Sequence, residues 1–183
     1  MTRIVAFLRA INVGGHYVKM PVLKQAFEDL GLTYVETFIA SGNVIFESSA
    51  ANFDSLEQQI EEHLNTVLGF PVVTFLRTVE EVAALAQYQP FPDVTQDETT
   101  ALSVAFLKAP PGDAARQKLF ALKTTVDDFD IHGREVYWLV QSQYGETNFS
   151  GAVLEKALGV PATMRNITTV RRIAGKFHHP PAA

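Results

Sequence analysis

The spacing of apolar residues along the first half of the chain predicts alternating strands and helices. Residues 3–9 alternate as in a strand, whereas apolar residues after Pro21 recur at the three- and four-residue spacing of a helix. Thr78 and Glu81 have the spacing of a capping box, which marks the start of a helix. In chain order, the first predicted elements are strand 3–9, a helix opened by Pro21, and strands 32–39 and 43–47 joined by the turn "ASGN". A helix capped by Asp54 or Ser55, strand 71–77 and a short helix that reaches Tyr88 follow.

This order of elements is βαββαβ with one added helix, which is the order of ferredoxin-like folds. We therefore predict that residues 1–88 form a first ferredoxin-like half with an added helix. The segment that follows, "QPFPDVTQDETT" (89–100), is rich in proline and acidic residues and has the composition of a linker.

The second half of the chain repeats the first. The segment "VAFLRA" (5–10) returns as "VAFLKA" (104–109), and "LGFPVVTFLRTVEEVA" (68–83) returns as "LGVPATMRNITTVRRIA" (158–174). A one-residue insertion in the second segment then places Val79 and Val82 opposite Val170 and Ile173, and a helix from Asp113 and a hairpin at 127–140 lie between the two anchors. We predict an α+β fold of two tandem ferredoxin-like halves that arose by internal duplication, with the second half at 101–175 and a flexible tail at 176–183.

Several predicted strands are apolar on both faces. In residues 3–9, Val5 and Phe7 occupy one face and Ile4, Ala6 and Leu8 the other. Such a continuous apolar sequence is typical of a strand that is covered on both sides. We therefore expect the second face of each sheet to be covered, either by the other half or by a second copy of the chain in a homodimer.

Composition narrows the classes of function. The chain has 183 residues, of which 47% are apolar, a net charge of −5 and no cysteine. The lack of cysteine excludes disulfides, thiolate zinc sites, iron–sulfur clusters and cysteine nucleophiles. The acidic charge argues against a nucleic-acid partner, and no stretch approaches the ~20 apolar residues of a membrane helix or has the pattern of a signal peptide. We expect a cytoplasmic protein with no membrane partner, no metal and no cofactor.

The loop after the first predicted strand carries the first candidate site. The first and third strands of a split βαβ unit are neighbours, so this loop meets the turn that precedes the third strand. Cations beside glycine-rich backbone and amide donors are typical of an anion site. The candidate residues for a small anionic or phosphorylated ligand are Arg9, Asn12, Gly14, Gly15, His16, Lys19, Ser41 and Asn43. The counterpart in the second half, "LKAPPGDAA" (107–115), is shorter, which makes the long polar loop a specialisation of the first half.

Two other interpretations of this loop stay open. In the first, the glycines form a tight loop, Asn43 fills a hairpin position and Arg9 binds backbone carbonyls in a structural or interaction protein. In the second, the same edge belongs to an enzyme that acts on an acidic metabolite, with no catalytic residue identified. The loop has neither the GxGxxG pattern of dinucleotide sites nor the GxxxxGK[ST] pattern of P-loops.

The second candidate group is Arg165, Asn166 and Thr169, with Arg171, Arg172 and Lys176 following on a short helix. In the structural interpretation, Asn166 caps this helix and the basic residues near its carboxyl end favour the helix dipole. In the functional interpretation, Arg165 and the other arginines face an anion or a partner. Asp127, Asp128 and Asp130 are interpreted as the solvated edge of a strand rather than as paired catalytic acids.

The quoted motifs resemble a known bacterial family. "AFLRAINVGG", followed by "KMP" and "SGNVIFES", is similar to the amino-terminal signature of domain of unknown function 1697, and "TMRNITTVRRIAG" (163–175) resembles that family's carboxy-terminal run. The resemblance covers essentially the whole chain and implies a two-part α+β fold without an established reaction. This sequence has Ala10 where the family usually has glycine, which predicts a less demanding backbone after Arg9.

Overall fold

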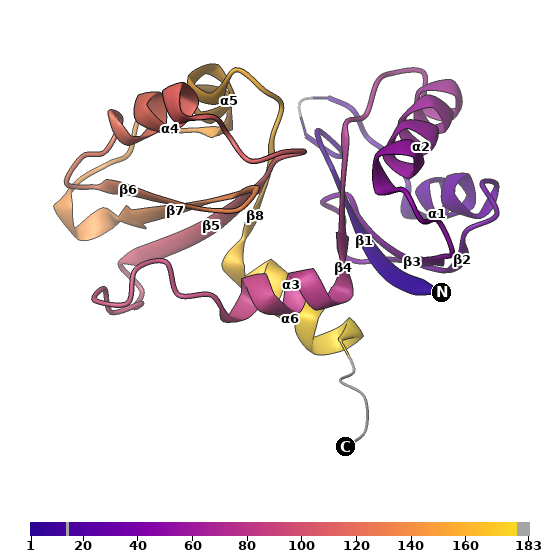
Figure 1. Ribbon diagram of the computed structural model, residues 1–183, viewed down its shortest axis with the longest axis horizontal. Coiled ribbons are helices and arrows are strands. Elements are labelled where there is room, and N and C mark those ends of the chain that lie inside the picture. The colour runs from indigo at the N-terminus through magenta and orange to yellow at the C-terminus, as the bar shows by residue number, and fades with distance from the viewer. Residues whose placement is uncertain (14, 179–183) are drawn as a thin grey trace. The chain divides into compact units, whose positions relative to one another are not determined.

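The computed structural model describes residues 1–13 and 15–178, and it shows a mixed α/β protein with two four-stranded antiparallel sheets (Figure 1). The first half contains β1 (Thr2–Leu8), α1 (Met20–Glu28), β2 (Thr33–Thr37), β3 (Asn43–Ser48), α2 (Phe53–Leu68), β4 (Thr74–Thr78) and α3 (Val79–Gln87). The second half contains β5 (Thr100–Phe106), α4 (Asp113–Phe120), β6 (Asp127–His132), β7 (Glu135–Gln141), a 3₁₀ helix (Ser142–Tyr144), α5 (Gly151–Leu158), β8 (Thr163–Asn166) and α6 (Ile167–Phe177).

The chain divides into two compact units that share two helices. The first unit comprises Met1–Ala84 and the chain from Ile173, and the second comprises Leu85–Arg172. The last turn of α3 therefore belongs to the second unit, and the carboxy-terminal part of α6 belongs to the first. Residues 88–99, between α3 and β5, hold no helix or strand, and the linker predicted at 89–100 ends one residue inside β5.

The first unit has a sheet with the strand order β2-β3-β1-β4, in which all neighbours are antiparallel. Helices α1 and α2 lie on one face of this sheet (Figure 1). Ile4 and Ala6 of β1 point into the core on that side, where they share a buried cluster with Phe27 of α1 and Ile60 of α2. Amphipathic helices on one face of the sheet thus account for half of the apolar pattern in β1.

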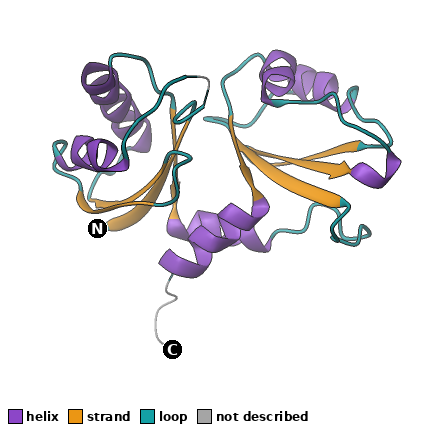
Figure 2. Ribbon diagram, turned by 180° about the vertical axis from the view of Figure 1, so that it is seen from behind, coloured by secondary structure: helices purple, strands orange, loops and turns teal. Residues whose placement is uncertain are grey.

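The second unit has the strand order β6-β7-β5-β8, again with antiparallel neighbours. Helices α4 and α5 lie on one face of this sheet, as Figure 2 shows from behind. Leu119 of α4 and Leu154 of α5 share a buried cluster with Phe129 and Val136 from the hairpin. The two units therefore repeat one strand order and one placement of helices, element by element.

The second face of each sheet is also buried. Val5, Phe7 and Phe75 have no exposed surface, although they point away from α1 and α2. Tyr137 of the second sheet is likewise buried, and the Tyr88 ring packs on it with the ring centroids 5.1 Å apart. The prediction that residues on both faces of these strands are buried is therefore confirmed.

Local hydrogen bonds define two helix starts. The predicted capping box is confirmed, because the Glu81 amide donates to Thr78 Oγ1 at 3.1 Å and the Thr78 amide donates to Glu81 Oε2 at 2.7 Å. The predicted cap of α2 at Asp54 or Ser55 is wrong. The Ser55 amide donates to Asn52 Oδ1 at 3.0 Å, so Asn52 is the cap and the helix begins at Phe53.

The strand register corrects the alignment of the two halves. Val5 pairs with Arg77, and Val104, its counterpart in the repeat, pairs with Arg165. Hence α3 and α6 correspond from their first residues, Val79 and Ile167, and the second half is shorter here rather than longer. The predicted match of Val79 with Val170 is wrong by one helical turn, because apolar residues that recur every turn give similar alignments at each shift.

The predicted flexible tail at 176–183 starts too early. Helix α6 continues to Phe177, whose side chain is 4% exposed and whose ring lies edge-on to Phe38 with centroids 5.9 Å apart. Lys176 forms an ion pair with Glu36. The rest of the predicted tail, residues 179–183, lies outside the described residues.

Candidate functional site

Asn12 joins the long loop after β1 to the turn before β3. Its Nδ2 donates to the Ala40 carbonyl at 2.8 Å, and its Oδ1 accepts from the Val18 amide at 2.7 Å. The Asn12 amide also donates to the His16 carbonyl at 2.9 Å, which closes the loop on itself. The predicted contact between the loop and the turn is therefore confirmed, and the Asn12 side chain supplies it.

The close contact between Ile11 of the loop and the turn before β3 requires a glycine at position 42. Its φ is +73°, and a Cβ built on it would lie 2.9 Å from Ile11 Cβ, closer than side chains tolerate. The Leu8 amide donates to the Gly42 carbonyl at 2.8 Å, which fixes the turn against the end of β1. At this distance there is no room for a side chain at position 42. The glycine in "SGN" thus serves both the left-handed turn and the packing of Ile11.

Strained backbone is concentrated at this edge. Ala10, Asn12 and Ile39 have φ values of 62°, 57° and 51°, in the left-handed region that non-glycine residues avoid. The expectation of a less demanding backbone at Ala10 is wrong, because Ala10 has the left-handed backbone that glycine adopts most readily. Backbone strain of this kind persists only where the surrounding structure fixes it, and it often marks functional sites.

Two of the candidate residues have their polar groups engaged inside the protein. Asn43 is fully buried, and its Nδ2 donates both to the Phe38 carbonyl and to Ser41 Oγ at 3.0 Å. These bonds match the two hydrogens of the amide group. Asn43 and Ser41 therefore hold the turn in shape, as the structural interpretation predicts for Asn43.

The basic candidates lie along the loop. Arg9 is half-buried, and its amide donates to the Val73 carbonyl at 2.9 Å. His16 is exposed on one side and stacks on Phe70 with ring centroids 4.2 Å apart. Lys19 is exposed and precedes α1 without capping it through its side chain. Gly15 is exposed with φ +94°, and the candidate Gly14 lies outside the described residues.

The sequence around this loop is basic in an otherwise acidic chain. Residues 9–19 contain Arg9 and Lys19 and no aspartate or glutamate, although the net charge of the chain is −5. A local excess of one charge sign attracts ligands of the other sign.

The second candidate pair is located in the second unit. Arg165 Nη1 donates to Thr163 Oγ1 at 2.8 Å and to the Met164 carbonyl at 2.9 Å, and burial lowers the pKa of this guanidinium to about 10. The Thr168 amide donates to Asn166 Oδ1 at 2.8 Å, so Asn166 caps α6 as expected.

Besides Arg165, the sequence did not indicate the burial of four charged residues, which are Glu57, Arg77, Asp127 and Glu135. Arg77 is only 1% exposed and donates from Nη1 to the Leu76 carbonyl at 2.8 Å. It is the counterpart of Arg165 in the repeat, and a correct alignment of the two halves would have indicated this from the sequence. Asp127 is 4% exposed, so its interpretation as part of a solvated edge is wrong. Asp128 and Asp130 are half-buried.

In the described part of the chain, no group of three or more histidine, aspartate or glutamate side chains is arranged to hold a metal ion. Within the same residues, none of the helices has the length and apolar character needed to cross a membrane.

Comparisons with known proteins agree with the fold. Residues 1–137 match the family model described as "Protein of unknown function (DUF1697)". No curated protein matches the sequence. A solved structure of a conserved bacterial protein from Streptococcus pneumoniae is similar, with a TM-score of 0.72 and 24% identity over 96% of this chain and 97% of that one. At this identity the likeness supports the fold alone.

Proposed function

Because the chain belongs to the DUF1697 family, whose description names no activity, we propose its function from the geometry of the site. We propose that the loop 9–19 and the turn 38–43 form a binding edge for a small anionic or phosphorylated ligand. Arg9, His16 and Lys19 supply positive or donor groups, Asn12 and Gly42 bring the two segments together, and Asn43 holds the turn in shape.

The observation that carries this proposal is the strain stored at the edge. Three non-glycine residues, Ala10, Asn12 and Ile39, adopt left-handed backbone in two segments that one side chain joins. The second unit makes the same connection from strand to helix with residues 107–112 alone. The long, strained loop lowers the stability of the first unit, and the second unit shows that the fold forms with a shorter connection. We therefore infer that the loop serves a function.

Inorganic phosphate is the probe that tests this proposal. Arg9→Gln removes a cation of the edge, and Lys108→Gln removes the cation at the equivalent position of the repeat. A ligand that binds only the folded state raises the Tm with its concentration. We expect phosphate to raise the Tm of the wild-type protein and of Lys108→Gln, and to have a much smaller effect on Arg9→Gln. An equal rise in both variants, or no rise in any of the three proteins, contradicts the proposal.

Exposed apolar side chains at the same edge favour a second candidate function. Val13, Tyr17 and Ile39 are 59%, 79% and 40% exposed. Such side chains are typical of a surface that contacts another protein, and a second copy of this chain is the partner to test first. Sedimentation of Tyr17→Ser against Tyr144→Ser, which alters an exposed tyrosine elsewhere, tests this alternative. Loss of a dimer in Tyr17→Ser alone supports it, and monomers in all proteins contradict it.

We also propose the finer description of the fold and setting. Each half is ferredoxin-like, because its first and second strands flank the third and its fourth strand lies beside the first. The common strand order and the matched Val5–Arg77 and Val104–Arg165 pairs support an internal duplication.

Absence of cysteine supports a cytoplasmic location, and the bacterial neighbour supports a bacterial origin. An enzymatic role on a bound metabolite stays a prediction without an assigned residue.

A further inference from the structure

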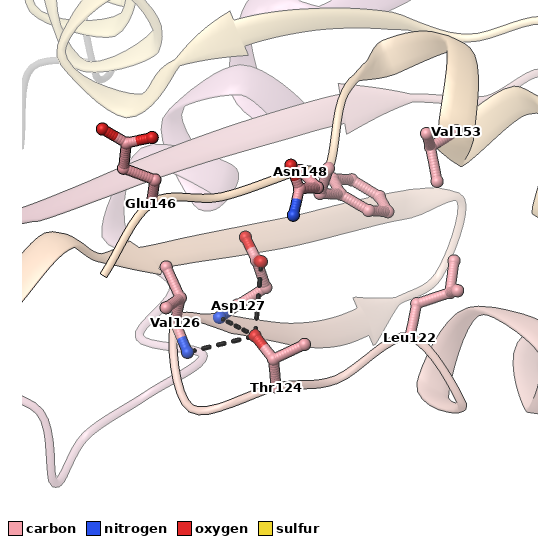
Figure 3. Close-up of a pocket in the computed structure, with 8 residues that line it drawn as sticks. Leu122, Thr124, Val126, Asp127, Glu146, Asn148 and Val153 are labelled. Carbon is pink, nitrogen blue, oxygen red and sulfur yellow. Dashed lines mark hydrogen bonds between the residues drawn. The ribbon is translucent and has the colours of Figure 1, made fainter. Parts of the chain in front are cut away.

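A cavity of about 320 Å³ lies in the second unit, between the start of β6, the segment 146–149 and helix α5 (Figure 3). Its walls are mostly apolar and include Leu122, Val126, Phe149 and Val153. Two carboxylates, Asp127 and Glu146, also line it. The volume falls at the lower end of the range of ligand pockets in proteins.

Asp127 is the buried polar group of this cavity. Its Oδ1 accepts from Trp138 Nε1 at 2.9 Å and from Thr147 Oγ1 at 2.6 Å. Its Oδ2 accepts a single long bond from Thr124 Oγ1, at 3.3 Å, which is drawn as a dashed line in Figure 3. All three donors are neutral, so the negative charge is solvated by dipoles and not matched by a cation.

The surroundings do not compensate this charge. None of the residues that line the cavity is lysine, arginine or histidine. Lys123 is close in sequence, but it pairs with Asp128 at 2.5 Å. Asp128 alternates with Asp127 along β6 and so points to the other face of the sheet. Glu146, which is exposed, adds a second negative group to the lining.

We infer that this cavity binds a small organic ammonium ion with a short apolar or aromatic body. A carboxylate has about four acceptor positions, and Asp127 uses three, so Oδ2 has capacity for an N–H donor. A charge-assisted bond of this kind is stronger when the acceptor is shielded from water. The apolar walls take the body of the ligand, and the exposed Glu146 draws the cation in. This site uses none of the residues of the anion-binding edge.

Benzylammonium is the probe, with benzyl alcohol and benzoate as controls of the same shape. The dissociation constants are measured by following the amide signals of Thr124, Val126 and Phe149 during NMR titrations. We expect benzylammonium to bind at least about tenfold more tightly than benzyl alcohol, and benzoate to bind more weakly than either. Equal affinities for the ammonium and the alcohol, or no shifts with benzylammonium at millimolar concentration, overturn the inference.

Matched variants locate the site. Asp127→Asn should weaken benzylammonium binding about tenfold or more, whereas Asp128→Asn, which changes the neighbouring carboxylate on the other face, should leave it unchanged. Glu146→Gln, at an exposed position, should weaken it less than Asp127→Asn. If Asp127→Asn does not fold, Val153→Phe fills the cavity from α5 and should abolish binding. Unchanged affinity in a folded Asp127→Asn protein, or in Val153→Phe, overturns the inference.

Discussion

Arg77 and Arg165 occupy the same register position in the two sheets. Arg77 pairs with Val5 and Arg165 with Val104, and these valines are counterparts in the repeat. Each arginine donates from Nη1 to the carbonyl of the residue before it, at 2.8 Å and 2.9 Å. Their side chains are 1% and 8% exposed. A buried guanidinium is therefore a feature that both halves share.

Replacing either arginine by lysine should destabilise the fold. Lysine keeps the charge but lacks the planar fork, so Arg77→Lys and Arg165→Lys should each lose about 2–3 kcal/mol in the free energy of unfolding. Arg171→Lys, at an exposed position, should stay within about 0.5 kcal/mol of wild type. Urea denaturation measures all three, and equal stabilities would show that the guanidinium geometry is unimportant.

Ala10 and Ala109 offer a test of the strain at the loop. Both follow a basic residue in the repeated motif, but Ala10 has φ +62° and Ala109 is not among the residues with positive φ. Ala10→Gly should therefore raise the free energy of unfolding by about 0.5–1 kcal/mol, whereas Ala109→Gly should lower it by a similar amount. Thermal or chemical denaturation gives the signs, and a loss of stability in Ala10→Gly would contradict the account of strain.

The two glycines Gly42 and Gly31 separate backbone strain from packing. Both have positive φ, but a Cβ on Gly31 meets nothing within 4 Å, whereas one on Gly42 lies 2.9 Å from Ile11 Cβ. Gly31→Ala should cost about 1 kcal/mol from the backbone alone, and Gly42→Ala should cost about 1–3 kcal/mol more. Equal losses of stability would mean that the loop moves away from the turn at little cost.

Stability at high pH depends on Tyr137. Burial raises the pKa of its phenol above the ordinary value of 10.0. The folded protein then keeps a proton that the unfolded chain releases, so the free energy of unfolding falls as the pH rises above 10. For one proton this loss reaches about 1.4 kcal/mol per pH unit.

Tyr137→Phe should flatten this dependence, because phenylalanine does not ionise. Tyr17→Phe alters a tyrosine that is largely exposed and should keep the steep wild-type dependence. Urea denaturation between pH 8 and pH 11 compares the three proteins. Parallel curves for wild type and Tyr137→Phe would contradict the role of the buried phenol.

Most elements of the fold were predictable because their signals are local. Alternating apolar residues located β1, and Thr78 with Glu81 formed the capping box that their spacing predicts. The register of the repeat was not predictable with the same certainty, because helix periodicity allows shifts by one turn. The strand pairs Val5–Arg77 and Val104–Arg165 are long-range contacts that fix it.

The candidate site was predictable in its location but not in its internal roles. Antiparallel neighbours placed the loop beside the turn, and Asn12 supplies that contact. The left-handed backbone of Ala10 follows from tertiary packing that overrides alanine's preference, so the residue type pointed the wrong way. Asp127 is buried and accepts hydrogen bonds from Trp138 and Thr147, which are distant in sequence. The sequence around Asp127 does not predict either contact.

The most direct measurement of the central claim is a map of phosphate binding on the first unit. Backbone amide signals of the wild-type protein are followed by NMR while inorganic phosphate is added, with chloride at equal ionic strength as the control. The account predicts saturable shifts centred on residues 10–19 and 39–43, and no comparable shifts at residues 107–112 of the repeat. Shifts spread evenly over the surface, or shifts that chloride reproduces, would contradict a binding site at this edge.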